Sequence, residues 1–124
     1  NSEKFLMKSS ALIGFVAGAI GVLIGSNLPK DIVKAPVSIT TFNIRIPFDQ
    51  WVLGFDSKEA EQMHKANNIK PIFRGVSVKD PKKVVVIHQS NSGSVEKFLS
   101  DNKKMIESTG HIMRTTRTSD WSFQ

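Results

Sequence analysis

The chain of 124 residues contains no cysteine, which excludes disulfide bonds and thiolate metal sites. It also lacks four motifs that mark common activities: the G-x-G-x-x-G dinucleotide fingerprint, the P-loop, the G-x-S-x-G nucleophile elbow and the H-E-x-x-H zinc motif. The carboxylates at positions 49, 56, 59 and 61 are typical of helix starts and solvated faces, not of a catalytic pair. The sequence therefore indicates architecture more readily than activity.

Basic residues are in excess, giving a net charge of +6, but they are scattered and accompanied by acids. A nucleic-acid surface usually shows a clustered basic stripe with interleaved aromatic residues, so we expect no nucleic-acid partner. The three histidines, His64, His88 and His111, form no H-x-H or H-x-x-x-H pair. We therefore expect no metal site and no cofactor.

One long uncharged run, residues 9–29, lies between Lys8 and Lys30. As a helix rising 1.5 Å per residue, it would span roughly the ~30 Å hydrocarbon core of a bilayer. Its glycines recur every three or four residues and so share one helical face, which would let another helix approach closely: Gly14, Gly18, Gly21 and Gly25.

Three interpretations of this run stay open. The first is an uncleaved membrane anchor, and the second is a cleaved export signal. The third is either an upstream extension from a misassigned start or a soluble helix buried in an oligomer. Lys4 and Lys8 suit a signal peptide, but the end of the run lacks an A-x-A cleavage pattern. We expect an apolar leader and linker over residues 1–36, anchored or exported through residues 9–29. A misassigned start would instead leave the protein cytoplasmic.

Residues 37–124 carry the patterns of a small water-soluble domain. Alternating or β-rich stretches predict four strands, over residues 37–46, 71–78, 84–89 and 112–123. In the third of these, Val84 and Val86 occupy one face while Val85 and Ile87 occupy the other. A strand that is apolar on both faces is expected at the centre of a sheet with both sides covered.

Two helical segments separate these strands. The first begins near Pro47, shows an apolar stripe, and restarts at a capping box of Asp56 and Glu59 to reach residue 66. Its stripe contains Phe48, Trp51, Val52 and Phe55. The second covers residues 94–109, and Gly110 is expected to terminate it.

The resulting order, β-α-β-β-α-β, predicts an α+β fold of the ferredoxin-like type. Right-handed crossovers give a four-stranded antiparallel sheet with both helices on one face. The third strand is apolar on the helix-free face as well. We therefore expect a homodimer through the sheet face, as in a dimeric α/β barrel.

Four segments resemble a short uncharacterised protein family of marine cyanobacteria: FNIRIPFDQW at 42–51, FRGVS at 73–77, DPKKVVVIHQ at 80–89 and ESTGHI at 107–112. The resemblance covers about residues 40–124, and it implies the fold but no activity. The topology is more distantly similar to the dimeric α/β-barrel group, which includes antibiotic-biosynthesis-type monooxygenases and haem-degrading enzymes. The haem-degrading relatives carry a histidine on their second helix, and residues 94–109 contain none, which counts against haem degradation.

The ligand-binding candidates are His88, Asn43, Arg45, Trp51 and His111. His88 ends a buried strand, where a polar ring needs a partner. Asn43 and Arg45 project opposite to Phe42, so we expect them in the dimer cleft. His111 follows Gly110 and is placed to cap the second helix. Arg74 is expected on the surface.

The sequence favours a small-ligand-binding or interaction module attached to a membrane. The alternative is a cofactor-independent oxygenase or isomerase. It predicts an enclosed cleft of a few hundred Å³ in which at least two of His88, Asn43 and Trp51 converge. A third hypothesis is a structural oligomerisation protein held together by the glycine face of the leader.

Overall fold

A computed structural model describes residues 33–124 of the chain. The leader and the predicted membrane attachment through residues 9–29 lie outside the described residues and stay predictions. None of the helices among residues 33–124 is long and apolar enough to cross a membrane. The elements run in the order β1 (Val37–Ile44), α3 (Phe48–Phe55), α4 (Lys58–Ala66), β2 (Lys70–Val76), β3 (Lys83–Gln89), α5 (Ser94–Asp101), α6 (Lys103–Ser108) and β4 (His111–Trp121).

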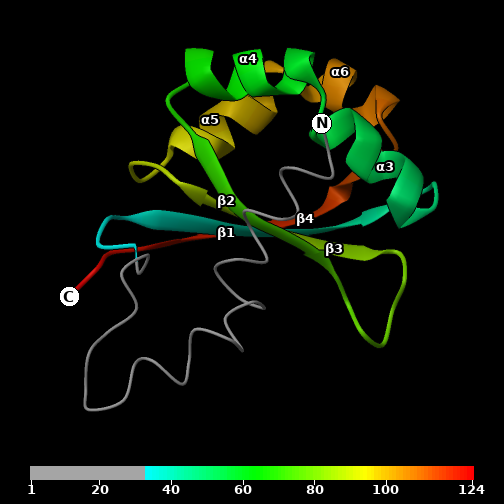
Figure 1. Ribbon diagram of the computed structural model, residues 1–124, viewed down its shortest axis with the longest axis horizontal. Helices are drawn as coiled ribbons and strands as arrows, with labels where there is room; N and C mark the ends of the chain where they lie inside the picture. The colour runs from blue at the N-terminus through cyan, green and yellow to red at the C-terminus, as the bar shows by residue number, and fades with distance from the viewer. Residues whose placement is uncertain (1–32) are drawn as a thin grey trace, which may run out of the picture.

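The strands form one four-stranded sheet in the order β2-β3-β1-β4, and every neighbouring pair is antiparallel. All the labelled helices lie on one face of this sheet (Figure 1). The predicted ferredoxin-like arrangement is therefore confirmed, with β1 and β3 in the centre. The strands end somewhat differently from the predictions; β1, for example, ends at Ile44 because the chain then turns through Pro47 into α3.

The two faces of the central strands separate as the alternation predicts. Val84 and Val86 are buried under the helices, whereas Val85 and Ile87 are half-buried on the open face. Phe42 and Ile44 of β1 point to the helices and form one buried cluster with Trp51 of α3. The central strands thus place their most apolar side chains against the helices, which drives the docking of the helical layer.

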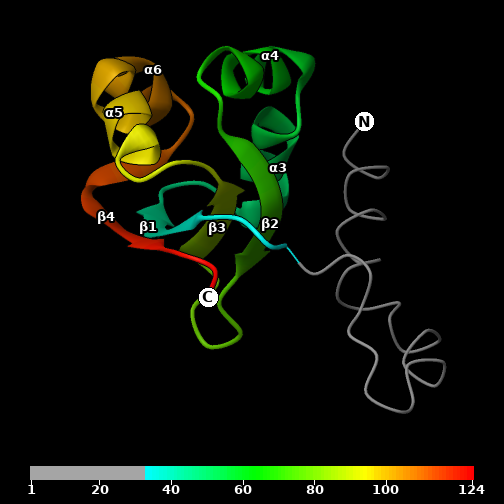
Figure 2. The same ribbon diagram turned by 90° about the vertical axis from the view of Figure 1, so that its left-hand side faces the viewer.

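The helical layer consists of two pairs that stand apart over the sheet (Figure 2). The pair α3–α4 covers the side of β2 and β3, and the pair α5–α6 lies toward β4. Two buried apolar clusters lie beneath the helices, and the second joins the α5–α6 pair to Ile69, which follows α4. The first contains Trp51 with β1 and β3 residues, and the second contains Ile69, Val95, Phe98 and Ile106.

Two details of the helices differ from the prediction. The second predicted helix is divided at Asn102, whose side-chain amide donates to the carbonyl of Phe98 and so competes with continued helical bonding. The N-terminal cap of α4 is Ser57 and not Asp56. The Ser57 hydroxyl accepts a hydrogen bond from the backbone N–H of Ala60. A serine at this position satisfies one of the free N–H groups at the helix start.

Asp56 instead forms a buried ion pair with Arg74 of β2. The Arg74 Nε donates to Asp56 Oδ1 over 2.8 Å, and a terminal guanidinium nitrogen donates to the other carboxylate oxygen. The two side chains are only 4 % and 1 % exposed. The expectation that Arg74 lies on the surface is therefore wrong, because the end of α3 brings a carboxylate over β2.

The first and last strands of the domain are hydrogen-bonded neighbours. Val37 at the start of β1 pairs with Trp121 at the end of β4. Next to this pair, the Ser38 hydroxyl donates to the Asp120 carboxylate, which also accepts from the backbone N–H of Gly93 at the start of α5. One carboxylate thus joins both terminal strands to the α5–α6 pair.

Candidate functional site

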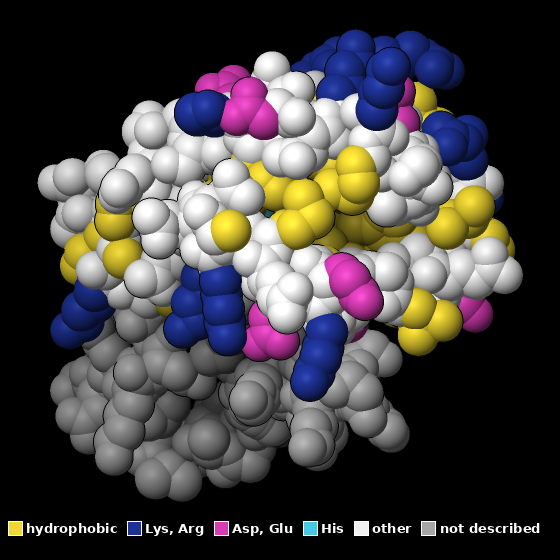
Figure 3. Space-filling model, turned by 90° about the horizontal axis from the view of Figure 1, so that it is seen from above, with side chains coloured by type: hydrophobic (Ala, Val, Ile, Leu, Met, Phe, Trp, Pro, Cys, Tyr) yellow, Lys and Arg dark blue, Asp and Glu magenta, His cyan; other side chains and the backbone are white. Residues whose placement is uncertain are grey.

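A cavity of about 300 Å³ lies between the sheet and the two helix pairs. Seen from the helical side, apolar side chains gather along the hollow between the pairs (Figure 3). The walls are mostly aromatic, aliphatic and thioether groups, including Phe42, Trp51, Phe55, Met63, Val86, Val95, Phe98, Leu99, Met105 and Ile106. Such a cavity is of the size and character of small-molecule sites.

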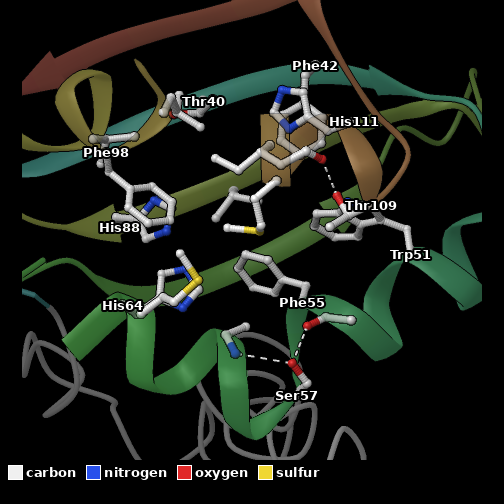
Figure 4. A pocket seen from close by; sticks show the side chains of 18 of the residues that line it. Thr40, Phe42, Trp51, Phe55, Ser57, His64, His88, Phe98, Thr109 and His111 are labelled. Atoms are coloured by element: carbon white, nitrogen blue, oxygen red, sulfur yellow. Dashed lines mark hydrogen bonds between the residues drawn. The ribbon is translucent and has the colours of Figure 1, made fainter. Parts of the chain in front are cut away.

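All three histidines of the chain line this cavity (Figure 4). His64 comes from α4, His88 from the end of β3, and His111 from the start of β4. Each is buried, with at most 7 % of its surface exposed. The fold therefore assembles from distant segments a group of imidazoles that no local spacing in the sequence indicates.

His88 is the most unusual of the three. It is 6 % exposed, and neither its Nδ1 nor its Nε2 has a hydrogen-bond partner among residues 33–124. Burial, together with a smaller electrostatic repulsion from His64, lowers the pKa of His88 to about 3. The ring is therefore neutral at pH 7, with one N–H donor and one acceptor nitrogen free for a bound molecule.

His64 lies beside His88, with the ring centres 5.2 Å apart. Burial lowers the pKa of His64 to about 4, although a hydrogen bond from the ring to the Ala60 carbonyl acts in the opposite direction. Because that bond uses the N–H of the neutral ring, the other nitrogen is left as an acceptor. The two imidazoles therefore form a polar end of a mostly apolar cavity.

His111 has partners within the protein. Its ring is stacked on Phe42 with centres 3.7 Å apart, and its Nε2 lies 2.7 Å from the Thr116 hydroxyl. Burial lowers the pKa of His111 to about 4. The expectation that His111 caps the second helix is not met, since these contacts fix the ring over the sheet.

Charge is scarce around the cavity. Among the described residues that line it, Glu59 is the only one with a formally charged side chain. No group of three or more histidine, aspartate or glutamate side chains among residues 33–124 is arranged to hold a metal ion. The site is thus suited to a neutral molecule, because an anion would meet no lysine or arginine in the described lining.

The structure divides the candidates from the sequence between two places. Trp51, His88 and His111 line the cavity. Asn43 lies on the opposite, open face of the sheet, where its backbone N–H donates to Thr115. Arg45 lies beyond the end of β1, and its guanidinium donates to the Glu107 carbonyl at the end of α6. Asn43 and Arg45 therefore do not join the other three.

Sequence reasoning missed His64 as a cavity residue. The signal was present, because Ala60, Met63 and His64 follow the i, i+3, i+4 spacing of one helical face. A histidine in that stripe must face the interior together with its apolar neighbours. Phe55 was identified as part of an apolar stripe, but sequence alone did not show that space remains beside it.

Comparison with known proteins places the domain in a family. The family model described as "Domain of unknown function (DUF3764)" matches residues 35–123. No curated protein and no solved structure matches the chain. The marine cyanobacterial source and the distant similarity to the dimeric α/β-barrel group therefore stay predictions. Because the match covers most of the chain, the resemblance to an uncharacterised family is confirmed: the chain belongs to the DUF3764 family.

Proposed function

We propose that the domain binds a small, mostly apolar molecule in the cavity between the sheet and the two helix pairs. The observation that carries this proposal is His88, a buried ring that has no hydrogen-bond partner in the described part of the chain and lies beside about 300 Å³ of space. Leaving a buried polar group unpaired costs about 1–3 kcal/mol. A cavity that keeps such a group is explained if a bound molecule supplies the missing hydrogen bond.

Catalysis by a cofactor-independent oxygenase or isomerase is the second candidate. It is favoured by His88 and Trp51, which line the same cavity, although Asn43 does not. A general base works best when its pKa is near the working pH. The pKa of His88 is lowered to about 3, so the ring is a weak base. We therefore favour binding over proton abstraction.

Filling the cavity should abolish binding. Ala60 lines the cavity, so Ala60→Trp places a large ring in the space, whereas Gln62→Trp adds the same ring on the exposed side of α4. Met63 and Met105 also line the cavity, and their methyl resonances report on occupancy. At least one of naphthalene, quinoline and 2-naphthol should shift both methyl signals in the full chain and in Gln62→Trp. None of the three compounds should shift them in Ala60→Trp.

Failure of all three compounds to shift the Met63 and Met105 signals in the full chain would contradict the proposal. Equal shifts in Ala60→Trp would also contradict it, since the compounds would then bind elsewhere.

The predicted homodimer remains a separate proposal. Val85 and Ile87 lie half-buried on the open sheet face, and Ile39 of β1 shares that face beside Ile87. Burying such side chains stabilises an assembly by roughly 1.5–3 kcal/mol each when burial is complete. Apolar patches of this kind commonly mark association surfaces.

Ile87→Lys should disrupt this dimer, because a charge would be desolvated between the sheets. Val78→Lys is the control, since Val78 is fully exposed in the β2–β3 hairpin. Sedimentation of the full chain in detergent should show half the mass for Ile87→Lys and an unchanged mass for Val78→Lys. A monomeric parent protein at tens of micromolar would refute the dimer.

A further inference from the structure

We infer that the bound molecule is a neutral fused-ring compound carrying a hydroxyl group, which hydrogen-bonds to the His64–His88 pair. This inference rests on the proposed binding function and specifies the ligand class. It stands on the size of the cavity, the absence of cationic side chains from its described lining, and the hydrogen-bonding capacity of the two rings. Each of these restricts the ligand independently.

Size favours two fused rings. An engineered cavity of about 150 Å³ accommodates benzene, and the cavity here is about 300 Å³. The aromatic walls suit a planar molecule, because aromatic rings gain from stacked and edge-to-face contacts. Trp51 and Phe55 already stack with centres 5.0 Å apart, and Phe98 contributes from the other helix pair. A bicyclic molecule can therefore touch both walls.

The charge in the described lining of the cavity disfavours an anionic ligand. Glu59 is the only formally charged side chain in the described lining, and it repels a carboxylate or phosphate. The histidines do not compensate for this at pH 7, because burial keeps all three neutral. Burying an unpaired anion in such surroundings is strongly unfavourable. The polar group of the ligand is therefore uncharged.

The histidine pair selects a hydroxyl among uncharged groups. The ring N–H of His64 donates to the Ala60 carbonyl, so the other ring nitrogen can only accept a hydrogen bond. Neither ring nitrogen of His88 has a hydrogen-bond partner in the part of the chain that the structure describes, so His88 can donate. A ketone could accept from His88 but would leave His64 unpaired, whereas a hydroxyl both donates and accepts. Ring centres 5.2 Å apart are close enough for one oxygen to reach both rings, which lie side by side in Figure 4.

The test measures how three 2-substituted naphthalenes bind to the full chain at pH 7: 2-naphthol, 2-methylnaphthalene and 2-naphthoate. The methyl and hydroxyl groups are similar in size, so their comparison isolates the hydrogen bond. Titrations followed by the Met63 and Met105 methyl signals should show 2-naphthol binding about tenfold more tightly than 2-methylnaphthalene, since one hydrogen bond contributes about 1 kcal/mol. 2-Naphthoate should not bind.

His88→Leu should reduce this preference to less than about threefold while retaining 2-methylnaphthalene binding. Gln89→Leu is the matched control, since Gln89 is the next residue of β3 and points to the open face. It should keep the tenfold preference. Should His88→Leu not fold, the imidazole ¹⁵N signals of His88 in the parent protein give the same information: they should move with 2-naphthol and not with 2-methylnaphthalene.

Equal affinities for 2-naphthol and 2-methylnaphthalene in the parent protein, or tightest binding of 2-naphthoate, would overturn the ligand class and leave the binding function standing. No shift with any of the three would overturn both. An unchanged preference in His88→Leu would show that the hydroxyl is recognised elsewhere.

Discussion

As the pH falls from 6.5 toward 4, the domain should lose stability steeply and unfold cooperatively near pH 5. The reason is that burial lowers the pKa values of His64 and His111 to about 4 and that of His88 to about 3 in the folded state. In the unfolded chain these groups return to about 6.5. Below that pH the unfolded state binds more protons than the folded state, so protons favour unfolding.

The expected size of this effect is large. At pH 5, which is 1.5 units below 6.5, each histidine lowers the free energy of unfolding by about 2 kcal/mol, at ~1.4 kcal/mol per pH unit. Three histidines together lose about 6 kcal/mol, which is comparable with the total stability of a typical small domain, about 5–15 kcal/mol. Above about pH 7.5 the histidines contribute no further change, because they are neutral in both states.

Circular dichroism of the full chain between pH 8 and pH 3 measures the transition. His88→Leu removes the group with the lowest folded-state pKa, so its midpoint should move to lower pH. Gln89→Leu should leave the midpoint in place. A domain that keeps its full signal and its urea resistance at pH 4 would contradict the prediction.

Asp56→Ala should destabilise the domain by about 3–5 kcal/mol. The change removes the carboxylate that receives two hydrogen bonds from the guanidinium of Arg74, whose side chain is only 4 % exposed. A buried arginine that loses its counter-ion keeps its desolvation cost without the compensating attraction. The pair also joins the end of α3 to β2, so its loss loosens one wall of the cavity.

Asp101→Ala is the control because it also removes an aspartate from an ion pair. The Lys97–Asp101 ion pair is also a direct contact, at 2.7 Å, but both side chains are more than half exposed, so solvent screens it and its loss should cost far less than the loss of Asp56. Urea unfolding of the full chain at pH 7 measures both variants. The double variant Asp56→Leu/Arg74→Met should recover part of the lost stability. Equal losses for Asp56→Ala and Asp101→Ala would show that burial does not strengthen the first pair.

Local patterns in the sequence were sufficient for most of the fold. The alternation of Phe42 and Ile44 with Asn43, and the doubly apolar run from Val84 to Ile87, predicted two strands and the central place of the second, but not which face of that run meets the helices. The order of strands and helices then restricted the topology, because crossovers are right-handed. Element ends were less accurate where side-chain hydrogen bonds decide them, as at Ser57 and Asn102.

The candidate site could be predicted only in part. His88 drew attention because it ends a buried strand, but its neighbours His64 and His111 lie 24 and 23 residues away in the sequence. Their convergence depends on how far the two helix pairs stand apart, which is a property of tertiary packing and leaves no local pattern. The Arg74–Asp56 pair was missed for the same reason, since a single arginine in a strand gives no sign of its partner.

The pairing of Val37 with Trp121 sets how the domain responds to mechanical force. Because β1 and β4 are antiparallel neighbours, a pull applied through residue 37 and residue 121 acts along the inter-strand hydrogen bonds at one end of the ladder. The bonds would then break one after another, as in a zipper, instead of sharing the load in shear. The Asp120 carboxylate lies at that first step, so the contact that joins both strands to α5 is also the one that tension would break first.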